Sequence, residues 1–176
     1  MSGVLRIRPF TAADAAVLPS WLDGPGELRL WAGDAFRWPL DPPQLARYRA
    51  ESETGSRRTW SAVEGDPERL VGHCSLLVTP DGRRGRLGRV LVAPRERHGG
   101  RGAAMLRGVL AEAFDGLGLT EVELGVYTRN TAALALYERL GFTPPADPAP
   151  DPPAPPDPWS VTTLTLRSPP RPDLPR

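Results

Sequence analysis

Apolar residues along the chain follow either a two-residue period or a period of about 3.6 residues, which are the periods of strands and amphipathic helices. In the first half, these patterns predict strands over 4–8, 59–64, 69–78 and 87–92, and helices over 11–22 and 41–53. Thr11, followed three residues later by Asp14, has the spacing of a capping box. Gly65-Asp66-Pro67 predicts a turn between two hairpin strands, and 24–40 is expected to be irregular with a short helical part.

The second half alternates strand and helix patterns. We expect a helix over 100–116, a strand over 121–127, a helix over 130–139 and a strand over 160–167. With the preceding strand, this order is β-α-β-α-β, which predicts an α/β sheet of mixed direction in a single domain over 1–167. Residues 144–158 hold nine prolines in fifteen positions and are expected to form a surface insertion, with a disordered tail over 168–176.

Bulk properties exclude several classes of protein. The 176 residues carry a net charge of +1, so no global field favours nucleic acid. One cysteine excludes a disulfide framework, and two histidines with it make a metal site improbable. No apolar run approaches the ~18 residues of a membrane span, and the N-terminus lacks a signal-peptide core. We therefore expect a soluble, cytoplasmic protein with no metal, nucleic-acid or membrane partner.

The most informative stretch is 90–106, VLVAPRERHGGRGAAML. An apolar strand stops at Pro94, a loop of arginine and glycine follows, and a helix begins near Gly100. Uncovered backbone N–H groups and the positive end of a helix predict an anion site for a phosphate or pyrophosphate. A P-loop is excluded because the chain has no lysine. A dinucleotide fingerprint is the weaker alternative, since position 105 is Met where glycine or alanine is required.

Arginines cluster before and within this stretch. The cluster comprises Arg83, Arg84, Arg86, Arg89, Arg95, Arg97 and Arg101. Its members form either a solvated surface or a region that attracts an acidic cofactor, and the sequence favours neither interpretation.

Two motifs identify a resemblance. Arg97, Gly100 and Gly102 form R-x-x-G-x-G, and residues 130–142 form N-x-x-A-x-x-L-Y-x-x-x-G-F. Together they resemble the GNAT superfamily of acetyl-CoA-dependent N-acetyltransferases over roughly residues 4–167. The resemblance implies a mixed, mostly antiparallel sheet flanked by helices. It also implies direct transfer of an acetyl group from acetyl-CoA to a primary amine of a small molecule or a protein.

The resemblance assigns roles to particular residues. Val90 N–H is expected to face the acetyl carbonyl, Val92 to pair with pantetheine, and Tyr137 to protonate the departing thiolate. The full expected cofactor-binding set is Val90, Leu91, Val92, Arg97, His98, Gly99, Gly100, Arg101, Gly102, Ala103, Asn130 and Tyr137. Asn130 is equally suited to cap the helix that it precedes. The alternative role for Tyr137 is packing in the hydrophobic core.

The general base is left open, because 87–92 carries no carboxylate where many members of the family have Glu. The candidates are Glu27, Asp34, His73, Glu123 or an ordered water. The missing carboxylate keeps a second function open, a non-catalytic acyl-CoA-binding sensor or interaction module. Trp31, Trp38 and Trp60 can wall an acceptor pocket or fill the core. A homodimer is common in the family, but no residue here indicates one.

Overall fold

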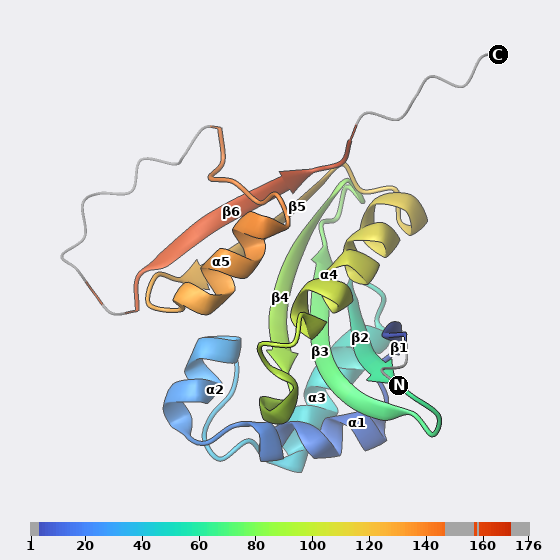
Figure 1. The fold of residues 1–176 in the computed structure, drawn as a ribbon, viewed down its shortest axis with the longest axis vertical. Helices are drawn as coiled ribbons and strands as arrows, with labels where there is room; N and C mark the ends of the chain where they lie inside the picture. The colour runs from blue at the N-terminus through green and yellow to red at the C-terminus, as the bar shows by residue number, and fades with distance from the viewer. Residues whose placement is uncertain (1–3, 147–156, 158, 170–176) are drawn as a thin grey trace.

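The computed structural model describes residues 4–146, 157 and 159–169. Six strands form one sheet in the order β1-β2-β3-β4-β5-β6 (Figure 1). Their bounds are β1 Arg6–Pro9, β2 Arg57–Glu64, β3 Arg69–Val78, β4 Arg84–Val92, β5 Glu121–Tyr127 and β6 Val161–Arg167. Only β4 and β5 are parallel, and every other neighbouring pair is antiparallel. This confirms the mixed, mostly antiparallel sheet, and it excludes the doubly wound sheet that a dinucleotide-binding protein requires.

Helices cover both faces of the sheet (Figure 1). Their bounds are α1 Ala12–Val17, α2 Pro25–Ala32, α3 Pro42–Glu53, α4 Arg101–Ala111 and α5 Thr131–Arg139. Three short helical turns complete the chain path: the 3₁₀ turn η1 Leu18–Trp21 after α1, the 3₁₀ turn η2 Pro94–Glu96 after β4, and the π-helical turn η3 Glu112–Gly116 after α4. One apolar cluster joins α4 and α5 to the sheet, and a second joins α1, α2 and α3 to Leu91 and Ala93 of the β4 end.

The element predictions were largely correct, with errors at boundaries. The capping box is confirmed, since Thr11 N–H donates to Asp14 Oδ2 at 2.8 Å and Asp14 N–H donates to Thr11 Oγ1 at 3.3 Å. The predicted helix over 11–22 is α-helical only to Val17, because Pro19 has no N–H for the next α-helical bond. Strands β2 and β4 begin two and three residues before the predicted 59 and 87, because the polar and glycine residues at these starts still pair with the end of β3.

Helix α4 is the crossover that a parallel pair such as β4–β5 needs. It buries Met105, Leu106, Val109 and Leu110 along one side. A Cβ placed on Gly72 of β3 would lie 2.9 Å from Met105 Sδ, so glycine there allows the helix to approach the sheet closely. The crossover therefore holds the N-terminus of α4 at the end of β4.

A bulge bends β4. Gly88 pairs with Ser75 and Leu91 with His73, so Arg89 and Val90 together oppose the single residue Cys74. Arg89 has φ 51°, a left-handed conformation that residues with a side chain seldom adopt. Bulges increase local twist and re-aim a strand, and this one lies just after the pairing of β4 with β5 ends at Leu87.

Most of the predicted proline-rich insertion, and residues 170–176 of the predicted tail, lie outside the described residues. Within the described ranges, no helix is both long and apolar enough to cross a bilayer. The same part of the chain brings no three potential His, Cys, Asp or Glu ligands together for a metal ion.

Candidate active site

A gap opens between β4 and β5. The parallel pairing covers only Arg84–Leu87 and Glu121–Leu124, although β4 continues to Val92 and β5 to Tyr127. Beyond these four pairs, β4 stays with β3 and β5 stays with β6, and the two halves of the sheet diverge (Figure 1). Ala93 N–H donates to Val71 O at 3.0 Å, so the backbone groups of Ala93 point toward β3. Because backbone groups point to alternate sides along a strand, the N–H and C=O of Val92 point away from β3, toward the gap.

The N-terminus of α4 lies where β4 ends. Gly100 precedes the helix with φ 77° and has no side chain to cap it. The first bond within the helix is Ala104 N–H to Gly100 O at 3.0 Å, so the N–H groups of Arg101, Gly102 and Ala103 have no acceptor inside the helix. Together with roughly half a positive charge at the helix end, these donors form an anion cradle beside the gap.

Arginine side chains brace the cradle. Arg97 Nε donates to Val92 O at 3.2 Å, and its Nη1 lies 3.4 Å from Glu27 Oε1. Arg101 Nε lies 3.0 Å from Glu64 Oε2 and 3.1 Å from Glu96 Oε2. Carboxylates thus already pair with both guanidinium groups, whereas the backbone N–H groups of Arg101, Gly102 and Ala103 have no acceptor within the helix. His98 is exposed with φ 63° and extends the same left-handed turn.

Helix α5 closes the gap on the α4 face. A Cβ on Gly102 would lie 3.3 Å from Leu136 Cδ2 and 3.5 Å from Val92 Cγ2, so α4, α5 and β4 converge at this glycine. Asn130 caps α5, accepting a hydrogen bond from Ala133 N–H at 3.2 Å, which confirms the capping role. Tyr137 follows on α5 with 7% of its surface exposed and its ring edge-on to Phe142. Burial raises the pKa of Tyr137, so the phenol keeps its proton at any ordinary pH.

Comparison with known proteins adds a direct match. The model of the acetyltransferase (GNAT) family matches residues 26–142, which span α2 to the start of the loop after α5. The chain belongs to the acetyltransferase (GNAT) family. It is therefore an acyltransferase, and the prediction made from the two sequence motifs is confirmed.

Solved structures share the fold. A spermidine N-acetyltransferase from Vibrio cholerae, solved in complex with CoA and spermine, is 16% identical with a TM-score of 0.75, covering 93% of this chain and 95% of that one. A domain from Methanocaldococcus jannaschii is 15% identical with a TM-score of 0.72, covering 96% and 100%. At such identities the likeness establishes the architecture of this GNAT protein and leaves its substrate to be argued from its own residues.

On the opposite face, α2 borders the gap. A Cβ on Gly33 at the end of α2 would lie 3.5 Å from the hydroxyl oxygen of Tyr127, the last residue of β5. The Tyr127 ring meets Trp159 edge-on at 5.3 Å. The Trp159 ring in turn lies 4.1 Å from the Arg29 guanidinium carbon and 5.0 Å from that of Arg129. Sequence patterns gave no sign of this cluster, because its members come from three separate segments of the chain.

Three of the four candidate bases are poorly suited to the role. His73 is fully buried, burial lowers its pKa to about 3, and its Nε2 lies 2.9 Å from the buried Tyr48 hydroxyl, so it is a hydrogen-bonded core residue. Glu27 accepts a hydrogen bond from Asp23 N–H at 2.9 Å and pairs with Arg97, so it fixes the start of α2 to the cradle loop. Asp34 is 88% exposed beyond α2 and lies 3.6 Å from Arg29.

Glu123 is the best-placed candidate. It lies on β5 opposite Arg86, one pair before the β4–β5 pairing ends, and its Oε1 is 3.1 Å from Arg86 Nη1. Its neighbours Val122 and Leu124 point into the α4–α5 core, so alternation puts Glu123 on the α2 face, at the apex of the gap. A carboxylate is thus present on β5, although β4 has none.

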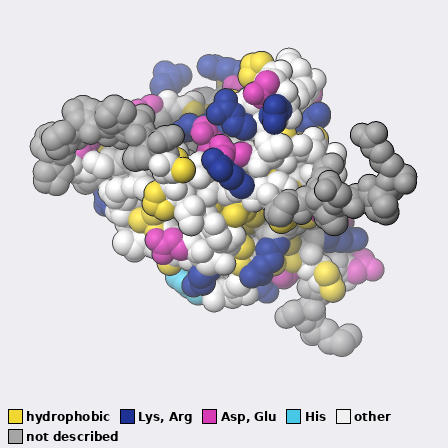
Figure 2. All heavy atoms as spheres, turned by 90° about the horizontal axis from the view of Figure 1, so that it is seen from above, with side chains coloured by type: hydrophobic (Ala, Val, Ile, Leu, Met, Phe, Trp, Pro, Cys, Tyr) yellow, Lys and Arg dark blue, Asp and Glu magenta, His cyan; other side chains and the backbone are white. Residues whose placement is uncertain are grey.

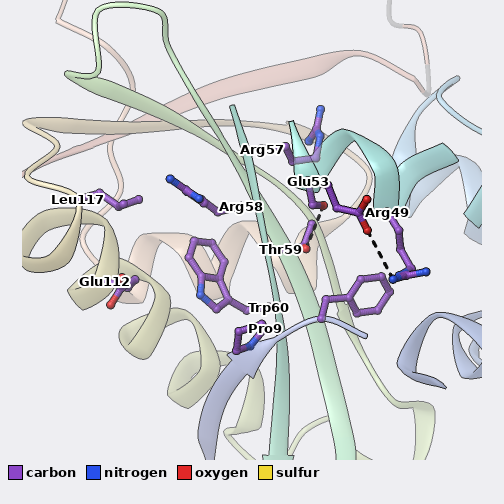
Figure 3. Close-up of a pocket in the computed structure, with 11 residues that line it drawn as sticks. Pro9, Arg49, Glu53, Arg57, Arg58, Thr59, Trp60, Glu112 and Leu117 are labelled. Carbon is purple, nitrogen blue, oxygen red and sulfur yellow. Dashed lines mark hydrogen bonds and ion pairs between the residues drawn. The ribbon is translucent and has the colours of Figure 1, made fainter. Parts of the chain in front are cut away.

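Cys74 and two of the three tryptophans that were candidates for an acceptor pocket belong to the core. Cys74 is fully buried, and burial raises its pKa to about 12, as expected for an inert thiol. Trp31 and Trp60 are buried, whereas Trp38 is 44% exposed. Trp60 also borders a cavity of about 460 Å³ between β2, α3 and η3 (Figure 3). No residue of β4 or β5 lines that cavity, so it is separate from the gap.

The arginine cluster of the sequence is divided in space. Arg83, Arg84 and Arg86 lie at the β3–β4 hairpin, and β4 carries the chain roughly 25 Å from there to the cradle. At this end of the sheet, basic side chains lie among acidic ones (Figure 2), including the pairs Arg86–Glu123 and Arg167–Glu121 at 3.1 Å. The positive charge at this end of the sheet is thus partly neutralised by neighbouring carboxylates.

Proposed function

We propose that the protein transfers an acetyl group from acetyl-CoA to a primary amine by direct attack. The observation that carries this proposal is the gap between β4 and β5, with the N-terminus of α4 at its mouth. A strand edge without a partner suits the amide-bearing pantetheine arm, and uncovered N–H groups suit a pyrophosphate. The family and the CoA-bound structural neighbour support the same cofactor.

The cofactor residues follow from this placement. The backbone of Arg97, His98, Gly99, Gly100, Arg101, Gly102 and Ala103 would hold the pyrophosphate, with Val92 N–H on the pantetheine arm. Val90, at the bulge, would direct its N–H at the acetyl carbonyl, and Leu91 would support the edge from the core behind it. The amide nitrogen of Asn130 is left for a cofactor contact, because its side-chain oxygen caps α5.

The chemistry requires two proton transfers. As the amine nitrogen bonds to the acetyl carbon, the C–S bond breaks and the sulfur leaves as thiolate. Tyr137 is the proposed acid for that sulfur, since its buried phenol is protonated and belongs to the helix that closes the gap. Glu123, directly or through water, is the proposed acceptor of the proton that the amine loses, from the opposite face of the sheet.

Calorimetric titration with acetyl-CoA, NAD and ATP tests the cofactor class. We expect micromolar binding of acetyl-CoA alone, followed by release of CoA thiol with members of an amine panel. Folded protein that binds no acetyl-CoA would overturn the proposal. Binding without thiol release from any amine would favour the acyl-CoA-binding module instead. We also infer a cytoplasmic location, which cell fractionation tests, because the cytoplasm holds acetyl-CoA and the single thiol is buried and unpaired.

A further inference from the structure

Arg89 occupies a strained position beside the proposed reaction centre. Its φ of 51° is a strained conformation for a residue with a side chain, and such strain clusters at functional sites. It immediately precedes Val90 in the bulge of β4. Its guanidinium carbon lies 4.7 Å from the ring centroid of Tyr48 and 5.4 Å from that of Phe36, so aromatic faces of α3 and of the loop after α2 hold the cation in place.

This half-buried cation lacks a dedicated counter-ion. Other arginines around the sheet pair with carboxylates, such as Arg86 with Glu123. Among the described residues no carboxylate forms an ion pair with Arg89, and its buried Nε has no hydrogen-bond acceptor. The nearby Glu51 is already 3.0 Å from Arg57 Nε. An unpaired charge that has partly left water is costly, and an anionic ligand would remove that cost.

A hollow lies next to Arg89 on the α2–α3 face of the sheet. It has a volume of about 400 Å³, and its charged lining residues are Arg37, Arg47, Arg89 and Glu51. A Cβ on Gly88, beside Arg89, would meet nothing within 4 Å, so the strand itself leaves room there. Three arginines against one committed carboxylate repel a polycation and attract an anion. This differs from what a site for spermine or spermidine requires.

Building on the proposed acetyl transfer, we propose that the acceptor is a small primary amine that also carries a carboxylate, and that Arg89 binds this carboxylate. The planar guanidinium matches a carboxylate in a bidentate pair. Because Arg89 adjoins Val90, a carboxylate held there places an amine of the same small molecule near the acetyl group. The face opposite the cradle thus selects the acceptor by its negative charge.

The test compares ω-amino acids of increasing length with their carboxamides, and with putrescine and spermidine. We expect kcat/KM for the best acid to exceed that of its carboxamide by about 10- to 100-fold, the range of a charge-assisted hydrogen bond. Arg89→Gln should remove most of this preference by lowering kcat/KM for the acids far more than kcat/KM for the carboxamides. Arg89→Lys should restore part of it.

Arg58→Gln is the matched control, because Arg58 is an exposed arginine of β2 away from the gap. The inference is overturned if spermidine or the carboxamides match the acids, or if Arg89→Gln slows acid and carboxamide equally, as a purely structural bulge residue would. If no amine turns over, calorimetry with CoA-bound protein decides: failure of the acids to bind refutes the inference. Equal rates with acids, carboxamides and spermidine would leave the proposed function intact, whereas absence of turnover with every amine, or of acetyl-CoA binding, would count against the proposed function itself.

Discussion

Removal of the Tyr137 hydroxyl separates a catalytic role from a packing role. Tyr137→Phe takes away one oxygen and leaves the ring edge-on to Phe142 at 5.8 Å. No hydrogen bond between described residues involves this hydroxyl, so the free energy of unfolding should change by less than about 1 kcal/mol. A positioned general acid contributes about 10²- to 10⁴-fold to rate, so kcat should fall by that factor, or about 3–5 kcal/mol.

Thiol release at saturating acetyl-CoA measures this loss, and calorimetry measures the cofactor affinity, which we expect to stay within about threefold. Because burial raises the pKa of Tyr137 above its ordinary value near 10, the wild-type rate should show no loss from phenol ionisation below pH 10. A wild-type kcat in a folded Tyr137→Phe variant would refute the acid role and leave Tyr137 as a core residue. A thermal unfolding curve for the same sample excludes misfolding as the cause of any loss.

Three further changes test the base, the cradle and the fold. Glu123→Gln should lower kcat/KM at pH 7 by about 10²-fold and recover in part as pH rises and the amine deprotonates unaided; a pH-independent loss would exclude the base role. Gly102→Ala should weaken acetyl-CoA binding, since its Cβ would lie 3.3 Å from Leu136 Cδ2, and added Leu136→Ala should restore it. Asp14→Ala should lower the free energy of unfolding by about 3–5 kcal/mol in urea titration. Burial disfavours the Asp14 carboxylate, but hydrogen bonds from Arg8, at 2.7 Å, and from other donors outweigh the effect of burial and lower the pKa of Asp14. The stabilisation that this carboxylate gives is therefore complete above pH ~4 and is lost as the pH falls further. The Asp14→Ala variant should lack this loss of stability at low pH.

Local patterns predicted the elements because hydrophobic period, caps and turn residues act over a few neighbours. Thr11 and Asp14 form the predicted capping box, and Asn130 caps the predicted helix. The glycine–arginine loop and the Tyr137 motif were informative for the same reason, since each lies within a single loop or helix. Their juxtaposition across the gap follows from the crossover between parallel strands, which the alternation of strand and helix already implied.

Features that depend on strand register or on distant side chains were beyond sequence reasoning. Nothing local indicates that Arg89 adopts φ 51°, because the bulge arises from the pairing of β4 with β3. The arginines of the sequence cluster look equivalent, yet Arg97 and Arg101 pair with carboxylates 70 and 37 residues away. The sequence left His73 open as a base candidate, because its burial against Tyr48 and Phe10 arises only when the sheet packs against the helices.

In the proposed reaction, the divergence of β4 from β5 also sets the direction from which each of the two substrates approaches. The cradle and α5 occupy one face of the sheet, so a cofactor held there presents its thioester to the gap from that face. The amine must then arrive from the α2–α3 face, where Glu123 and Arg89 lie. The proposed acid and the proposed base therefore lie on opposite faces of the sheet, and on this proposal Glu123 of β5 takes the place of a carboxylate on β4. On the same proposal the charges of the α2–α3 face select the acceptor, while the cradle on the other face holds the cofactor.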